Sequence, residues 1–212
     1  MIKIQKNPTN FELRDAFSEL CIEIKDLKTA AVQLELLSKD NPTNYTVHTD
    51  LGYVLREIGE IEKAKYHYSQ ALEINNKYPG AYNNMGYLLL HDIGDYENAH
   101  FNLLNAIKYD QSFPNPYRHL GDLYRIDDFD KQDFNASKMF YLRSLELRKD
   151  YKESIYGLKI IYLLENQKKY QISDKERQAL NVIKIDVDKF EEKYETYFKD
   201  IDITNVYLGE SV

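Results

Sequence analysis

The sequence predicts an all-α fold, a solenoid built from repeated helix-turn-helix units. The 212 residues contain only 8 glycines and 5 prolines, below the usual shares of about 7% and about 5%, and this suits helices better than a turn-rich β fold. Gly52, Gly86 and Gly121 are separated by 34 and 35 residues, and each follows a large apolar residue. A period of this length is typical of helix pairs that stack on their neighbours.

Composition and charge exclude several other classes of protein. Hydrophobic residues at 43% and charged residues at 30% are enough for a folded core, unlike in disordered chains. A formal net charge of −7 argues against a general binder of nucleic acid or of anionic membranes, because such binding needs clustered Lys and Arg. With a single Cys21, no apolar leader and no long apolar run, we expect a soluble cytoplasmic protein.

The units at residues 45–78 and 79–113 share a full pattern of small and large residues. An apolar residue and a glycine occupy the seventh and eighth places, and alanines occupy the twentieth and twenty-seventh, after one inserted residue in the second unit. The matching positions are Gly52, Ala64 and Ala71 in the first unit, then Gly86, Ala99 and Ala106 in the second. Small residues there let two helices approach closely. The pattern resembles the tetratricopeptide repeat, whose units stack into a right-handed superhelix with a concave inner face.

The units on either side match less completely. Residues 114–151 keep Gly121 but need about four extra residues around 127–133, so we expect a longer, acidic loop between the two helices of that unit. Residues 11–44 have the right length, but Ser18 stands where the pattern has glycine. This substitution indicates a degenerate unit.

The predicted array covers residues 11–172 and ends in a partial fifth unit, residues 152–172. Residues 1–10 form an N-terminal extension, and residues 202–212 form a tail. Tyrosine must build much of the core, because the chain has 19 Tyr, 9 Phe and no Trp. The tyrosines at packing places are Tyr68, Tyr82, Tyr117, Tyr124, Tyr141 and Tyr162.

Residues 173–201 are predicted to form one long amphipathic helix. Ser173 and Glu176 have the spacing of a capping box, and apolar residues then recur every three or four positions. The alternation at 183–187 would also suit a strand. Two roles are open for this helix: it caps the end of the solenoid, or it forms a self-association seam that would give a homodimer.

The resemblance implies a binding face. In this family, first-helix residues line a concave groove that holds a segment of another protein, as an extended peptide or a helix. The expected partner-binding residues are Tyr53, Asn83, Asn84, Tyr87, His91, Arg118, His119, Asp122 and Arg125. Further residues at the N-terminal end of the groove are Asp15, Glu19, Glu23, Thr49, Asp50, Arg56 and Glu57. The groove therefore grades from acidic to mildly basic along the chain.

Asn83 and Asn84 are the most informative pair, because amides donate and accept toward a peptide backbone without demanding a sequence. Tyr53 and Tyr87 add flat amphipathic surface. The competing interpretation is that all four are solvated helix residues. Chaperone-binding members of the family clamp a C-terminal carboxylate, but of their clamp residues only Asn84 is present. We therefore predict that a free Glu-Glu-Val-Asp-type C-terminal peptide does not bind.

The sequence contains no signature of catalysis. Its glycines occur one per repeat rather than in a phosphate-binding loop, and its five histidines form no close ligand pair. His48 is expected to pack inside its repeat, and Cys21 to be a buried, inert thiol. We expect no enzyme activity, no cofactor and no metal. The predicted function is a non-catalytic scaffold or adaptor; the alternatives are a structural assembly protein that self-associates through its C-terminal helix, or a non-catalytic subunit of an enzyme complex.

Overall fold

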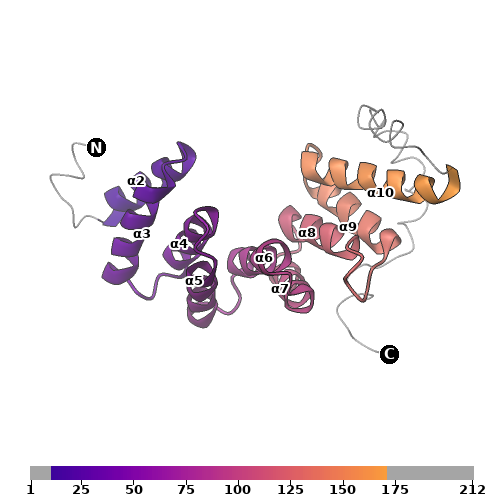
Figure 1. Ribbon diagram of the computed structural model, residues 1–212. Coiled ribbons are helices and arrows are strands. Elements are labelled where there is room, and N and C mark those ends of the chain that lie inside the picture. Colours follow the sequence, from indigo (N-terminus) through magenta and orange to yellow (C-terminus); the bar gives the residue numbers. More distant parts are fainter. Residues whose placement is uncertain (1–10, 171–212) are drawn as a thin grey trace. The chain divides into compact units, whose positions relative to one another are not determined.

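The computed structural model describes residues 11–170 (Figure 1). The predicted N-terminal extension, the predicted helix at 173–201 and the tail lie outside the described residues. The chain divides into two compact units between Pro116 and Tyr117. We describe each by itself, as the N-terminal unit and the C-terminal unit.

Every element of the described residues is helical, which confirms the all-α prediction. The elements are α2 (Phe11–Glu23), α3 (Leu27–Asp40), α4 (Tyr45–Glu57), α5 (Ile61–Ile74), α6 (Pro79–Leu88), the π-turn η1 (Leu89–Ile93), α7 (Tyr96–Tyr109), α8 (Pro114–Tyr124), α9 (Phe134–Leu147) and α10 (Lys152–Tyr170). From α2 to α7, each helix packs against the next one in the chain. The fold is therefore a helical-repeat solenoid. None of these helices combines the length and apolar character that a membrane span requires.

Local sequence fixes where the helices begin and end. The Asn44 side chain accepts hydrogen bonds from the first amides of α4, and Asp95 does the same for α7, so each satisfies backbone donors that the helix leaves free. After α4 the chain turns at Gly59, and after η1 it turns at Gly94, with φ of 86° and 79°. Glycine adopts this left-handed conformation without a steric penalty.

The repeats at residues 45–78 and 79–113 each close on a glycine of the first helix. A Cβ atom added to Gly52 would lie 2.6 Å from the ring of Tyr68, and one added to Gly86 would lie 2.7 Å from Leu103. Both separations are well below the optimal carbon–carbon distance of about 3.5–4.0 Å. Glycine therefore permits the close packing of α4 on α5 and of α6 on α7.

The residue inserted in the 79–113 unit is absorbed at the end of α6. There the chain forms the π-turn η1, whose wider backbone ring holds one residue more than an α-helical turn. The amides of Gly94 and Asp95 both donate to the carbonyl of Leu89. Because the extra residue is taken up before Gly94, α7 starts in the same register as α5.

The C-terminal unit is organised around Tyr141 on α9. This fully buried side chain packs on Gly121 of α8, where an added Cβ would lie 2.6 Å from the ring, and on Gly157 of α10. The Ser137 hydroxyl donates to the carbonyl of Gly121 over 2.5 Å. Between α8 and α9, Phe129 is buried against the ring of Tyr124, so one aromatic side chain anchors the long loop.

Most of the tyrosines at predicted packing places are inside. The buried ones are Tyr68, Tyr117, Tyr124 and Tyr141. Tyr82 is only half-buried and stacks on Tyr109, with ring centroids 5.6 Å apart. Tyr162 lies outside the residues whose side chains the structure describes.

His48 is a packed residue, as predicted. It is 7% exposed; its Nδ1 lies 3.0 Å from Nδ1 of His67, and its Nε2 lies 3.1 Å from the Pro42 carbonyl oxygen. Since the carbonyl can only accept, His48 carries its proton on Nε2 and accepts from His67 at Nδ1. Burial, aided by His48, lowers the pKa of His67 to about 4. Cys21 is also buried, and burial raises the pKa of its thiol, which keeps it in the unreactive protonated form.

Candidate interaction site

The predicted groove residues fall into two groups, one in each unit. Tyr53 belongs to α4 and His91 belongs to η1. The predicted residues between them belong to α6, and these are Asn83, Asn84 and Tyr87. Arg118, His119 and Asp122 belong to α8, and Arg125 follows its last residue. Asn83 and His119 are buried, His91 is exposed, and the rest are half-buried. Asn83 contacts Asn84 and Tyr87 contacts His91 in the first group, and the second group gathers around Asp122 and Arg118.

Asn83 and Asn84 have different environments although they are adjacent. Asn83 is only 4% exposed, and its Nδ2 donates to Oδ1 of Asn84 over 3.1 Å. This bond uses the acceptor of Asn84 and leaves its N–H groups without an acceptor among the described residues. Asn84 therefore presents donors, and Asn83 holds it in place.

Aromatic and guanidinium groups of the N-terminal unit form a ladder. The Arg56 guanidinium carbon lies 4.2 Å from the ring centroid of Tyr87 and 5.7 Å from that of Tyr53. On η1, the His91 ring lies 4.4 Å from Tyr87. These four residues, Tyr53, Arg56, Tyr87 and His91, are called the aromatic ladder below. Cation–π contact of this kind attracts the guanidinium to the face of the ring.

Two carboxylates border the aromatic ladder. Glu57 forms an ion pair with Arg56, and an Asp92 carboxylate oxygen lies 3.8 Å from Nη1 of Arg56. Beneath them the hydroxyl of Tyr68 is buried without a well-formed hydrogen bond. Burial raises the pKa of Tyr68, and the positive charge of Arg56 opposes the rise. Sequence reasoning missed Asp92, which faces Arg56 only because the π-turn carries it there.

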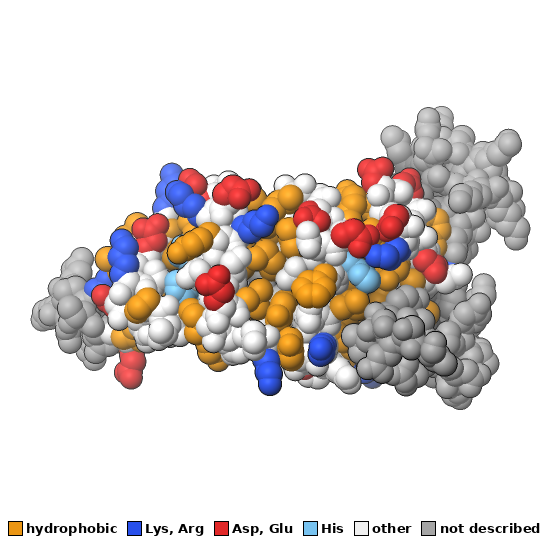
Figure 2. Space-filling view, turned by 90° about the horizontal axis from the view of Figure 1, so that it is seen from below, with side chains coloured by type: hydrophobic (Ala, Val, Ile, Leu, Met, Phe, Trp, Pro, Cys, Tyr) orange, Lys and Arg blue, Asp and Glu red, His pale blue; other side chains and the backbone are white. Residues whose placement is uncertain are grey.

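A second acidic group lies toward α2. Burial, with the negative charges of Asp15 and Glu19, raises the pKa of Asp50 to about 6. Burial also raises the pKa of Asp15. In Figure 2, basic side chains lie beside carboxylates and apolar groups.

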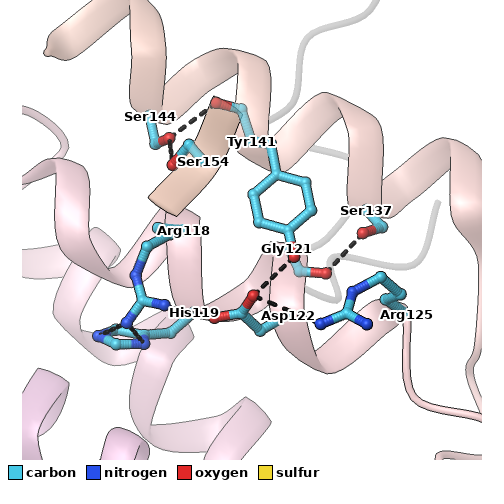
Figure 3. Close-up of polar contacts among 9 residues, drawn as sticks. All are labelled: Arg118, His119, Gly121, Asp122, Arg125, Ser137, Tyr141, Ser144 and Ser154. Carbon is cyan, nitrogen blue, oxygen red and sulfur yellow. Dashed lines mark hydrogen bonds and ion pairs between the residues drawn. The ribbon is translucent and has the colours of Figure 1, made fainter. Parts of the chain in front are cut away.

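In the C-terminal unit, the predicted residues gather around the carboxylate of Asp122 (Figure 3). Arg118 Nη1 donates to its Oδ2 over 2.6 Å, and the Tyr141 hydroxyl donates to its Oδ1 over 2.6 Å. Arg125 Nη2 lies 3.9 Å from Oδ1, and Arg118 Nη2 lies 2.6 Å from Nδ1 of His119. The carboxylate thus fixes two arginine side chains at once.

Neither unit, taken by itself, brings together three His, Cys, Asp or Glu ligand atoms for a metal ion among the residues the structure describes. The chemistry of both groups is that of recognition: amide and guanidinium donors, carboxylates and flat aromatic rings.

Sequence models of one repeat family match two overlapping stretches of the chain. A model described as a TPR repeat matches residues 52–91, and one described as a tetratricopeptide repeat matches residues 79–113. Residues 52–113 therefore carry tetratricopeptide repeats. The resemblance predicted from the glycine and alanine spacing is confirmed. No curated protein matches the sequence.

Solved structures of tetratricopeptide repeat proteins share the fold. PilF of Pseudomonas aeruginosa is 23% identical, with a TM-score of 0.64 over 74% of this chain and 70% of its own. TTC0263, a thermophilic TPR protein of Thermus thermophilus, is 16% identical, with a TM-score of 0.63 over 76% and 85%. YrrB, described as a TPR protein with an unusual peptide-binding site, is 13% identical, with a TM-score of 0.56 over 77% and 82%. At such identities the likeness shows the fold alone.

Proposed function

We propose that this tetratricopeptide repeat protein is a non-catalytic scaffold or adaptor that binds a segment of another protein on the first-helix face of its repeats. Proteins with this repeat are protein-interaction scaffolds in general. The observation that carries the proposal lies in the N-terminal unit. There Asn84 presents donors on the same helix as Tyr87, a member of the aromatic ladder.

The surface suits a chain segment because it offers both polar and flat apolar contacts. Amide donors such as those of Asn84 can meet backbone carbonyls of any sequence. Tyrosine rings supply contact area with little loss of side-chain entropy. YrrB, a structural neighbour, is described as having a peptide-binding site, and this likeness supports a peptide ligand here.

Further features of the proposal concern the rest of the chain. The formal net charge of −7 supports a protein partner over a nucleic acid, whose binding would favour clustered Lys and Arg. Arg118, His119, Asp122 and Arg125 form the proposed contact group of the C-terminal unit. A cytoplasmic location, the absence of a membrane partner and a homodimer through residues 173–201 stay predictions, as do the roles of assembly protein and enzyme subunit.

Affinity capture from cell extract, compared across three forms of the full chain, tests the proposal. The Asn84→Ala/Tyr87→Ala double variant removes the proposed contacts; Phe101→Ala removes an exposed aromatic side chain from α7, outside the first-helix face. Proteins retained by the wild type and by Phe101→Ala should be lost from the double variant, while helicity by circular dichroism stays the same. If the double variant retains every protein, the binding site lies elsewhere.

A further inference from the structure

The two tyrosines of the aromatic ladder lie within about the length of one turn of a polyproline II helix. The two distances from Arg56 place the ring centroids of Tyr53 and Tyr87 no more than about 10 Å apart. A polyproline II helix rises about 3.1 Å per residue and repeats every three residues, so one turn spans about 9 Å. One turn of such a segment is therefore long enough to reach both tyrosines.

The hydrogen-bonding groups beside the ladder suit the same conformation. A polyproline II segment makes no internal hydrogen bonds, and its prolines have carbonyl acceptors but no N–H donors. Such a ligand needs donors from its receptor. Asn84 presents its N–H groups, and the Arg56 guanidinium lies within the ladder itself.

The other common ways of holding a peptide fit this face less well. Adding a strand needs an exposed sheet edge, and no described element is a strand. Docking an amphipathic helix needs an apolar groove. The exposed large hydrophobic side chains of the N-terminal unit lie on α2, α3, α5, η1 and α7 or just after α2 and α4, and none lies on α4 or α6.

The charge of the site adds a second requirement. Arg56 is the one guanidinium of the ladder, whereas Glu57 and Asp92 bring two carboxylates to it. The excess of negative charge favours a ligand with a basic side chain near its prolines, and like-charge repulsion disfavours an acidic one.

From this geometry we propose that the aromatic ladder binds a proline-rich segment of a partner protein in the polyproline II conformation, with Lys or Arg next to the prolines. The inference rests on the proposed function and specifies the chemical class of its partner. Proline rings pack against the half-buried rings of Tyr53 and Tyr87, Asn84 donates to a ligand carbonyl, and Asp92 and Glu57 attract the basic side chain. Recognition of aromatic-lined surfaces by preformed polyproline II segments follows the same physics elsewhere.

Fluorescence anisotropy with two labelled nonapeptides tests the proposal on the full chain. One probe is Ala-Pro-Pro-Arg-Pro-Pro-Arg-Pro-Ala; the other has alanine in place of every proline and the same charge. We expect the proline probe to bind at least about tenfold more tightly than the alanine probe, because the alanine chain loses both the rings and the preformed conformation. Equal affinity of the two probes would overturn the inference.

Two variants locate the binding and guard against misfolding. Tyr87→Leu keeps an apolar side chain but removes the flat ring; Tyr53→Ala removes the other ring. Each should weaken the proline probe about tenfold, as expected for an aromatic anchor, whereas Phe101→Ala should leave its affinity within about twofold. Circular dichroism confirms folding. Tight binding that neither ladder variant weakens would place the site elsewhere and contradict the proposal.

Selection from a random heptapeptide library separates this inference from the proposed function. The wild-type chain is the bait, and Tyr87→Leu is used for counter-selection. Enrichment of proline with Lys or Arg supports the inference. Enrichment of sequences without proline overturns it and leaves the proposed function intact. If no peptide is enriched, both are contradicted.

Discussion

Residues 45–78 and 79–113 build the same helix pair over different side chains. Tyr68 fills the space against Gly52, whereas Leu103 fills the equivalent space against Gly86. The residue four positions after each glycine is also polar in the first repeat and apolar in the second: Arg56 follows Gly52, and Leu90 follows Gly86. The third unit repeats the first combination: Tyr141 packs on Gly121, and Arg125 follows four positions later.

The difference shows how the interior of a repeat sets the chemistry of its surface. A tyrosine against the glycine carries its hydroxyl through the packing layer, and a buried hydroxyl is stable only near polar groups. Tyr141 meets the Asp122 carboxylate, and Tyr68 ends near the Arg56 guanidinium. Leu103 has no hydroxyl that needs a polar partner. The place equivalent to Arg56 is accordingly occupied by Leu90, which is apolar and buried.

The largest effect should come from filling the glycine sites. We expect Gly52→Ala to lower the free energy of unfolding by about 2–3 kcal/mol, because the added Cβ collides with a rigid tyrosine ring. Gly86→Ala should lower it by only about 1 kcal/mol, since Leu103 can change rotamer. Urea denaturation measures both values. Equal losses at the two sites would contradict the packing difference.

The His48–His67 pair should give the first of these two repeats a source of acid sensitivity that the second lacks. Folding lowers the pKa of His67 to about 4 from 6.5, so the unfolded chain binds the proton first as the pH falls. Stability from this group is therefore lost as the pH falls from about 6.5 to about 4. In the next unit the equivalent residue is Asn102, which does not titrate.

The urea midpoints of the wild type and of His67→Gln, measured from pH 7 to pH 4.5, test this expectation. The variant should lose less stability than the wild type over that range. Asp50 acts in the opposite direction in both chains, because folding raises its pKa to about 6 and stability from it falls as the pH rises through that value. A histidine variant with an unchanged pH profile would contradict the assignment.

Removing the hydroxyl should lower the stability more at Tyr141 than at Tyr68. Tyr141→Phe breaks the hydrogen bond to Asp122 and should cost about 1.5 kcal/mol, because the acceptor is charged. Tyr68→Phe removes a buried hydroxyl that lacks a well-formed hydrogen bond and should change the stability by less than about 0.5 kcal/mol. The comparison fails if Tyr68→Phe is the more destabilising of the two in thermal unfolding.

The smallest expected effect concerns a free C-terminal peptide. A free Glu-Glu-Val-Asp peptide should not bind at millimolar concentration, since of the family's carboxylate clamp only Asn84 is present. Isothermal titration calorimetry checks this directly. Tight binding that Asn84→Ala abolishes would show that the site accepts a C-terminal carboxylate.

The helices could be predicted because their determinants are local. Glycine and alanine at fixed places, and a proline at the start of α6, are visible in the sequence itself. The inserted residue was also visible, but its place in a π-turn was not, because that depends on how α6 packs. Two further features followed from packing alone: the burial of Asn83 beneath Asn84, and the approach of Asp92 to Arg56.

Site-specific photo-crosslinking tests the central claim most directly. A benzophenone amino acid is placed at position 84 on α6 in one chain and at position 101 on α7 in another, and each chain is irradiated in cell extract. If the first-helix face holds a partner segment, position 84 should give discrete crosslinks to protein, and position 101 should give none in common with it. Identical crosslinks from both positions, or crosslinks from position 101 alone, would contradict the account.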